Sequence, residues 1–107
     1  MSRGGLPPVL MGQVAERFRA LGEPARLQIL DALRQGERSV GDLVDATGLT
    51  QANVSRHLGV LHAAGLVTRR KEGAFVFYAA HEEVWQLCDL VCGRLRADAE
   101  LVRRAVG

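Results

Sequence analysis

Residues 39–65 read SVGDLVDATGLTQANVSRHLGVLHAAG, and they contain the start and stop signals of two helices. Ser39 is a good N-cap residue, and Asp42 follows three positions later with the spacing of a capping box. Gly48 ends that short helix, and Thr50 is placed to cap a second helix that begins directly after it. A short helix, a tight turn that contains glycine and a second helix together predict a helix-turn-helix unit.

Two further helices are predicted before this unit. Apolar residues from Val9 to Leu21 recur at steps of three and four, which is the pattern of an amphipathic helix. Pro24 fits the first turn of the next helix, where its missing N–H costs nothing, and that helix runs to about Gln35. Residues 1–8, which contain two consecutive prolines, are expected to form a flexible tail. The second helix has four apolar residues that we expect to face inward: Leu27, Ile29, Leu30 and Leu33.

After the helix-turn-helix unit, the sequence pattern changes to the period of two that is typical of β-strands. Residues 66–70 (LVTRR) and 74–78 (AFVFY) are predicted to be two strands, and Gly73 between them can take the positive φ of a hairpin turn. A long helix is predicted over residues 81–104. The 107 residues are therefore expected to form a single winged helix-turn-helix domain, mainly α with a small β-hairpin wing (α+β), in the order α-α-α-α-β-β-α.

The overall charge is too small to indicate a nucleic-acid partner by itself. The net charge is +2, from 14 Lys and Arg against 12 Asp and Glu, so the distribution of charge has to carry the case. Residues 50–63 contain no Asp or Glu, which suits a surface that approaches phosphate. No run of 18 apolar residues and no adequate signal-peptide core is present, so we expect a cytoplasmic protein with reduced thiols and no membrane partner.

The second helix of the unit and the hairpin carry the side chains that DNA recognition needs. Side chains on the outer face of that helix suit base edges and phosphates, its N-terminus is an anion site, and the wing carries consecutive basic residues. Each feature alone is also what a solvated surface shows, but their order along the chain favours DNA binding. The predicted DNA-binding residues are Thr50, Gln51, Asn53, Ser55, Arg56, His57, Arg69, Arg70 and Lys71.

The segments LGEPARLQIL, LTQANVSRHLGVLHAAGLV and EGAFVFY resemble the ArsR/SmtB family of metal- and metalloid-responsive repressors over roughly residues 18–80. The resemblance implies a repressor rather than an enzyme. It also implies a homodimer that joins through the first and last helices, with 81–104 as the dimerisation helix. Such a dimer would bind a double-stranded operator with twofold-related half-sites until an inducer lowers its DNA affinity.

The sensor motifs of that family do not all carry over. Arsenic sensors hold Cys-Val-Cys at the start of the helix that precedes the recognition helix, which is the second helix of the unit. At that place this chain has Ser39-Val40-Gly41. Zinc and nickel sensors use Asp, His and Glu ligands along the last helix, which here has no histidine after His81. The remaining candidates are Cys88 and Cys92, which lie one helical turn apart.

Three interpretations of Cys88 and Cys92 stay open. They are small buried residues of the dimer interface, or ligands of an inducer ion such as As(III), Cd(II) or Zn(II), or a redox switch. Cβ atoms at this helical spacing are about 5–6 Å apart, whereas a disulfide needs about 3.5–4.5 Å. A redox switch would therefore form its disulfide between the two subunits rather than within one helix. No cofactor is otherwise required. A small thiol-active enzyme or metal carrier is the alternative class, against which stands the lack of a C-x-x-C motif.

Overall fold

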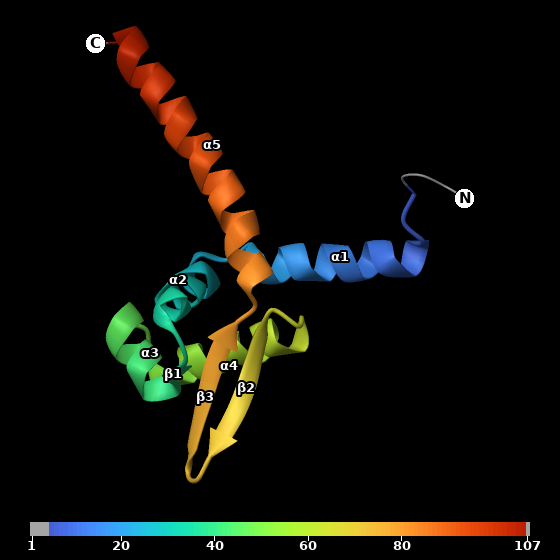
Figure 1. Ribbon diagram of the computed structural model, residues 1–107, viewed down its shortest axis with the longest axis vertical. Helices are drawn as coiled ribbons and strands as arrows, with labels where there is room; N and C mark the ends of the chain where they lie inside the picture. Colours follow the sequence, from blue (N-terminus) through green and yellow to red (C-terminus); the bar gives the residue numbers. More distant parts are fainter. Residues whose placement is uncertain (1–4, 107) are drawn as a thin grey trace.

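The computed structural model describes residues 5–106, and its element order agrees with the expected one apart from one added strand. Helices α2, α3 and α4 and the hairpin gather in one body, from which α1 and α5 project in different directions (Figure 1). The strands form an antiparallel sheet in the order β1-β3-β2. The elements are α1 (Pro8–Leu21), α2 (Pro24–Ala32), the 3-10 turn η1 (Leu33–Gln35), β1 (Arg38–Ser39), α3 (Val40–Thr47), α4 (Gln51–Ala63), β2 (Val67–Glu72), β3 (Phe75–Ala80) and α5 (Glu82–Val106).

The predicted caps of the helix-turn-helix unit are confirmed. Ser39 Oγ accepts a hydrogen bond from the Asp42 backbone N–H at 3.1 Å, and an Asp42 carboxylate oxygen accepts one from the Ser39 N–H at 3.3 Å. Thr50 Oγ1 accepts from the Asn53 N–H at 3.2 Å and starts α4 in the same way. Gly48 between the helices has a φ of 74°, which a side chain with a Cβ would oppose. The two caps fix where α3 and α4 begin, and Gly48 ends α3.

The β structure extends further than the sequence indicated. Lys71 and Glu72 belong to β2, because the ladder continues to the pair Glu72–Phe75 and leaves only Gly73 and Ala74 in the turn. The short strand β1 was not predicted, and it pairs Arg38–Ser39 with β3. The wing is therefore attached along β3 to the segment that leads into α3.

The core lies where α2, η1, α3 and α4 meet the start of β2. Leu27 was expected to face inward with its neighbours on α2, and this was wrong: its side chain is 41% exposed. The predicted burial of Ile29, Leu30 and Leu33 is confirmed. The largest fully buried residues are Ile29, Leu30, Leu33, Leu43, Val54, Leu58 and Leu61.

Helices α1 and α5 leave apolar side chains uncovered. Val84 at the start of α5 is buried and Cys88 packs against the core, but the same stripe continues beyond the body of the domain. Among the residues that the structure describes, no helix is long and apolar enough to cross a membrane. The exposed members on α5 include Val91, Leu95, Val102 and Val106, and those on α1 are Val9, Leu10, Met11, Val14 and Phe18.

Candidate nucleic-acid interface and cysteine cleft

Helix α4 has a polar outward face and an apolar inward face. Thr50, which caps this helix, is also exposed, and because its Oγ1 accepts the Asn53 N–H, its own hydrogen remains available to a phosphate. Arg56 donates to the Asn53 side-chain oxygen at 3.3 Å, which pairs two polar groups on one turn. The exposed predicted residues on the helix are Gln51, Asn53, Ser55 and Arg56. The buried residues are Val54, His57, Leu58 and Leu61.

His57 was expected beside the outward residues, and the structure places it inside the domain instead. Its side chain is only 2% exposed, because it lies one turn after Val54 and shares the inward face of α4. Its Nδ1 lies 3.3 Å from a guanidinium nitrogen of Arg26. Burial lowers the pKa of His57, and the nearby positive charge of Arg56 lowers it further. A ring so enclosed is not available to base edges or phosphates.

The consecutive basic residues of the wing divide between its two faces. Arg70 Nε and Nη2 donate to the two carboxylate oxygens of Glu37 at 3.0 and 2.9 Å, and Nη1 donates to Glu72 at 2.8 Å. The guanidinium also lies 5.1 Å from the ring centroid of Phe77. These bonds raise the pKa of Arg70, and Arg70 lowers the pKa of Glu37. Two carboxylates therefore offset the charge of Arg70, which the sequence had placed in the DNA-binding set.

Arg69 and Lys71 lie on the opposite face of the wing from Arg70, because successive side chains of a strand alternate. Both are exposed, and neither makes an ion pair with any residue between 5 and 106. Figure 1 shows the hairpin and α4 on the side of the molecule away from the free end of α5. On the wing, the basic side chains that pair with no carboxylate within residues 5–106 are therefore Arg69 and Lys71.

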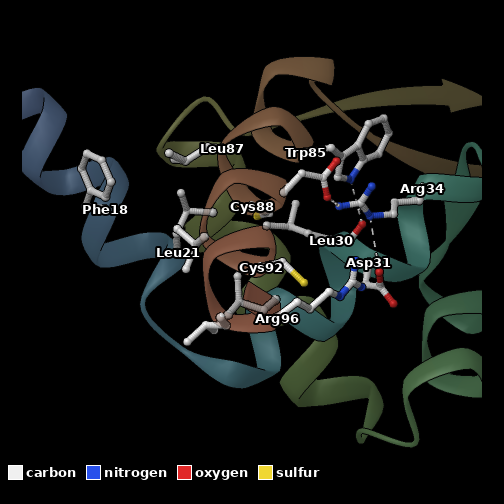
Figure 2. Close-up of a pocket in the computed structure, with 14 residues that line it drawn as sticks. Phe18, Leu21, Leu30, Asp31, Arg34, Trp85, Leu87, Cys88, Cys92 and Arg96 are labelled. Carbon is white, nitrogen blue, oxygen red and sulfur yellow. Dashed lines mark hydrogen bonds and ion pairs between the residues drawn. The ribbon is translucent and has the colours of Figure 1, made fainter. Parts of the chain in front are cut away.

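Cys88 and Cys92 line one cleft of about 720 Å³ between α5, α2 and the end of α1 (Figure 2). The sulfur of Cys92 points toward the side of the cleft where Asp31 and Arg96 lie. Burial raises the pKa of the Cys88 thiol, and the nearby charge of Arg34 opposes that rise. Most of the lining is apolar: Phe18, Leu21, Leu27, Leu30, Trp85, Leu87, Val91 and Leu95.

Side chains that the sequence did not single out hold the start of α5 on the domain. Trp85 Nε1 donates to the Leu30 carbonyl at 3.2 Å, and Arg34 donates to Asp89 at 2.6 Å. These contacts join residues 55 positions apart, so no local pattern reveals them. Within residues 5–106 no cluster of three or more His, Cys, Asp or Glu is placed to hold a metal ion. The cleft brings the two thiols near the carboxylates of Asp31 and Asp89.

Comparison with known proteins places this architecture in a family. The model of the family described as bacterial regulatory protein, arsR family, matches residues 23–69. Among curated relatives, the transcriptional regulator Rv0324 of Mycobacterium tuberculosis is 43% identical over 98 residues, which are 91% of this chain and 42% of that protein. The repressor SdpR of Bacillus subtilis is 30% identical over 69 residues, which are 64% of this chain and 77% of that protein. The chain matches 42% to 58% of the length of the first curated relatives.

Solved structures agree with this placement. The homodimeric winged helix-turn-helix DNA-binding domain of Mb0332 from Mycobacterium bovis, a fragment of residues 1–100, superposes with a TM-score of 0.75. It is 39% identical, and the match covers 92% of this chain and 94% of that one. NolR from Sinorhizobium fredii follows with a TM-score of 0.72 and 30% identity, over 83% of this chain and 93% of its own. The chain has a winged helix-turn-helix fold, its relatives are transcriptional regulators, and it belongs to the ArsR family of bacterial regulatory proteins.

Proposed function

We propose that the chain is a transcriptional repressor that binds an inverted-repeat operator in double-stranded DNA as a homodimer and leaves it when an inducer binds. The observation that carries this proposal is the outward face of α4, which is polar, free of carboxylates and preceded by the exposed cap Thr50. A helix of this kind fits the major groove, with its side chains at base edges and its N-terminus at a phosphate. The operator would lie on bacterial DNA, so we place the protein in the cytoplasm.

Helix α4 and the wing would contact different parts of the DNA. Gln51, Asn53, Ser55 and Arg56 on α4 would contact bases and nearby phosphates, because amide and guanidinium groups match the donor and acceptor pattern of the major groove. The wing would contact the phosphate backbone beside that groove. Base contacts supply the sequence preference and phosphate contacts supply the salt dependence, so the two surfaces can be tested separately.

Gln51→Ala is expected to relax the base preference at one position of the operator. A bidentate contact between an amide side chain and adenine contributes about 1–3 kcal/mol of discrimination, and alanine removes it without removing a phosphate contact. Fluorescence anisotropy with single-base operator variants measures this preference. The same preference in Gln51→Ala and in the wild type would exclude Gln51 from base reading.

Arg69→Ala and Lys71→Ala are each expected to weaken binding to every duplex alike. Each substitution removes one phosphate contact, so the slope of log affinity against log salt should fall by about 0.9. Arg70→Ala is the matched control, because Glu37 and Glu72 already offset its charge, and it should leave the slope unchanged. A slope that changes for Arg70→Ala and not for Lys71→Ala would reverse the assignment of the two wing faces.

The uncovered apolar sides of α1 and α5 support the homodimer. Leu95 and Val102 continue the stripe that Val84 and Cys88 begin, yet nothing in the described chain covers them. A long exposed apolar stripe is a mark of a protein interface. The Mb0332 domain is homodimeric, and SmtB of Mycobacterium tuberculosis is named a repressor, which agrees with a repressor that acts as a dimer.

The inducer that we propose binds or oxidises Cys88 and Cys92. A thiophilic ion, As(III), Cd(II) or Zn(II), suits two thiolates one helical turn apart. Because the sequence has two cysteines, a third thiolate would come from the partner protomer at the dimer interface. An inducer that binds the DNA-free dimer more tightly than the DNA-bound dimer must lower the DNA affinity by the ratio of those two affinities. An oxidant that joins Cys92 of one protomer to Cys92 of the other would shift the same equilibrium between the DNA-free and DNA-bound dimers. Outside this interface no cofactor is required.

Replacing both cysteines by serine is expected to abolish the response to the inducer and to leave DNA binding intact. As(III), Cd(II), Zn(II) or an oxidant is titrated into the protein–DNA complex, and release is followed by anisotropy. Burial raises the pKa of Cys88, so its thiol is protonated at neutral pH and ion binding must displace the proton. Release by an ion should therefore become more sensitive as the pH rises from 6 to 8. A double variant that releases DNA as readily as the wild type would show that the cysteines only pack the interface.

A further inference from the structure

We infer that Arg26 is a positioning residue for DNA recognition, which fixes recognition helix α4 to the end of α1 through His57. This inference rests on the proposed function and adds to it how the dimer face and the DNA face are held in register. The juxtaposition is between three elements: the last turn of α1, the first turn of α2 and the middle of α4.

The guanidinium of Arg26 joins α1 to α2. Its side chain is only 12% exposed. Nε donates to the Ala20 carbonyl at 2.6 Å, and Nη2 is 3.4 Å from the Arg19 carbonyl and 3.3 Å from a Glu23 carboxylate oxygen. The last carbonyls of a helix lack partners within the helix, and Arg26 supplies one to Ala20, while the Arg19 carbonyl also accepts the Gly22 N–H at 3.2 Å. The end of α1 is therefore tied to a buried positive charge.

The remaining nitrogen of Arg26 reaches the recognition helix. Two guanidinium nitrogens approach the His57 ring: Arg26 Nη1 lies 3.3 Å from Nδ1, and Arg56 Nη2 lies 3.4 Å from Nε2. A neutral ring has one acceptor, and we assign it to Nδ1 because Arg26 is mostly buried whereas Arg56 is exposed. In this tautomer Nε2 carries the proton, and it lies 3.9 Å from a Glu23 carboxylate oxygen. Arg56 therefore approaches a ring whose single acceptor Arg26 already uses.

The consequence for function is geometric. Helix α1 carries part of the proposed dimer face, and α4 carries the proposed base-reading face, so the distance between the two recognition helices of a dimer depends on the angle between α1 and α4. Arg26 and His57 hold that angle through partly buried hydrogen bonds, which tolerate little displacement. Loss of the contact should impair base reading, which needs both helices in register, more than the non-specific attraction to phosphate, which needs only charge.

The test is a double-mutant cycle on DNA affinity with wild type, Arg26→Met, His57→Leu and the double variant. Anisotropy is measured with the DNA upstream of the protein's own gene and with a scrambled duplex. Each single variant should lose about tenfold in affinity for the upstream DNA, and the double variant no more than either single, because both break one coupled contact. Binding to the scrambled duplex, its salt slope and the dimer mass by sedimentation should stay as in the wild type. His57→Asn, which keeps an acceptor near the position of Nδ1, should recover most of the loss.

Additive losses in the cycle, equal losses on both duplexes, or failure of His57→Asn to recover affinity would each overturn the inference. If Arg26→Met does not fold, Arg26→Lys replaces it, because lysine keeps the positive charge but has one donating nitrogen where arginine has three. Arg26→Lys should lose affinity for the upstream DNA as Arg26→Met does. Wild-type affinity of Arg26→Lys would also overturn the inference. A wild type that binds the two duplexes equally would instead remove the proposed function, and the inference with it.

Discussion

Leu95→Glu is expected to convert the protein to a monomer and to lower its affinity for operator DNA by at least about a hundredfold. Leu95 is 63% exposed in the single chain and lies on the stripe of α5 that the proposed dimer would bury. A carboxylate forced into an apolar interface without a partner costs several kcal/mol. The monomer would then hold a single half-site and lose the gain of binding two linked sites at once.

Gln86→Glu is the matched control for this experiment. Gln86 is exposed and lies on the opposite face of α5 from Leu95, and the two substitutions each add one negative charge to the same helix. Sedimentation equilibrium and operator anisotropy should give wild-type values for Gln86→Glu. If Leu95→Glu also stays dimeric, the stripe on α5 does not form the interface.

Leu58→Ala is expected to lower the free energy of unfolding by about 2–5 kcal/mol, which is a large part of the stability of a single domain. Leu58 is fully buried on the inward face of α4, where it packs with the core of the domain. Truncation removes apolar contacts and leaves a cavity that rigid neighbouring helices cannot fill. The midpoint of urea denaturation should fall accordingly.

Val60→Ala separates this packing effect from the helix itself. Val60 lies on the same helix but is 37% exposed, so its truncation should cost less than about 1 kcal/mol. Both variants are compared at one protomer concentration, because the unfolding of a dimer depends on concentration. Equal destabilisation by the two substitutions would mean that α4 is not anchored through Leu58.

The helix-turn-helix unit could be predicted because its signals are local. The capping box of Ser39 and Asp42 and the cap at Thr50 act within one turn, and their geometry follows directly from residue type and spacing. Strand β1 could not be predicted, because two residues carry no period and the strand exists only through its pairing with β3. The sequence thus predicted the fold correctly where hydrogen bonds join residues three or four positions apart.

The candidate site was harder to predict because burial and charge compensation are set by distant residues. The inward face of α4 is formed by Val54, His57, Leu58 and Leu61. The helical period of the sequence therefore places His57 on that face, but its polar ring suggested a position on the outward face. The compensation of Arg70 depends on Glu37, 33 residues away, and no local pattern indicates that pair. The roles of Cys88 and Cys92 stay a prediction.

Specific DNA binding by a dimer can be measured in a single titration. A labelled duplex from upstream of the protein's own gene is titrated at several salt concentrations, with a scrambled duplex as competitor. We expect two protomers per duplex, an affinity at least about a thousandfold above that for the scrambled duplex, and a linear fall of log affinity with log salt. Equal affinity for the two duplexes, or no binding to either, would show that the protein is not a sequence-specific repressor.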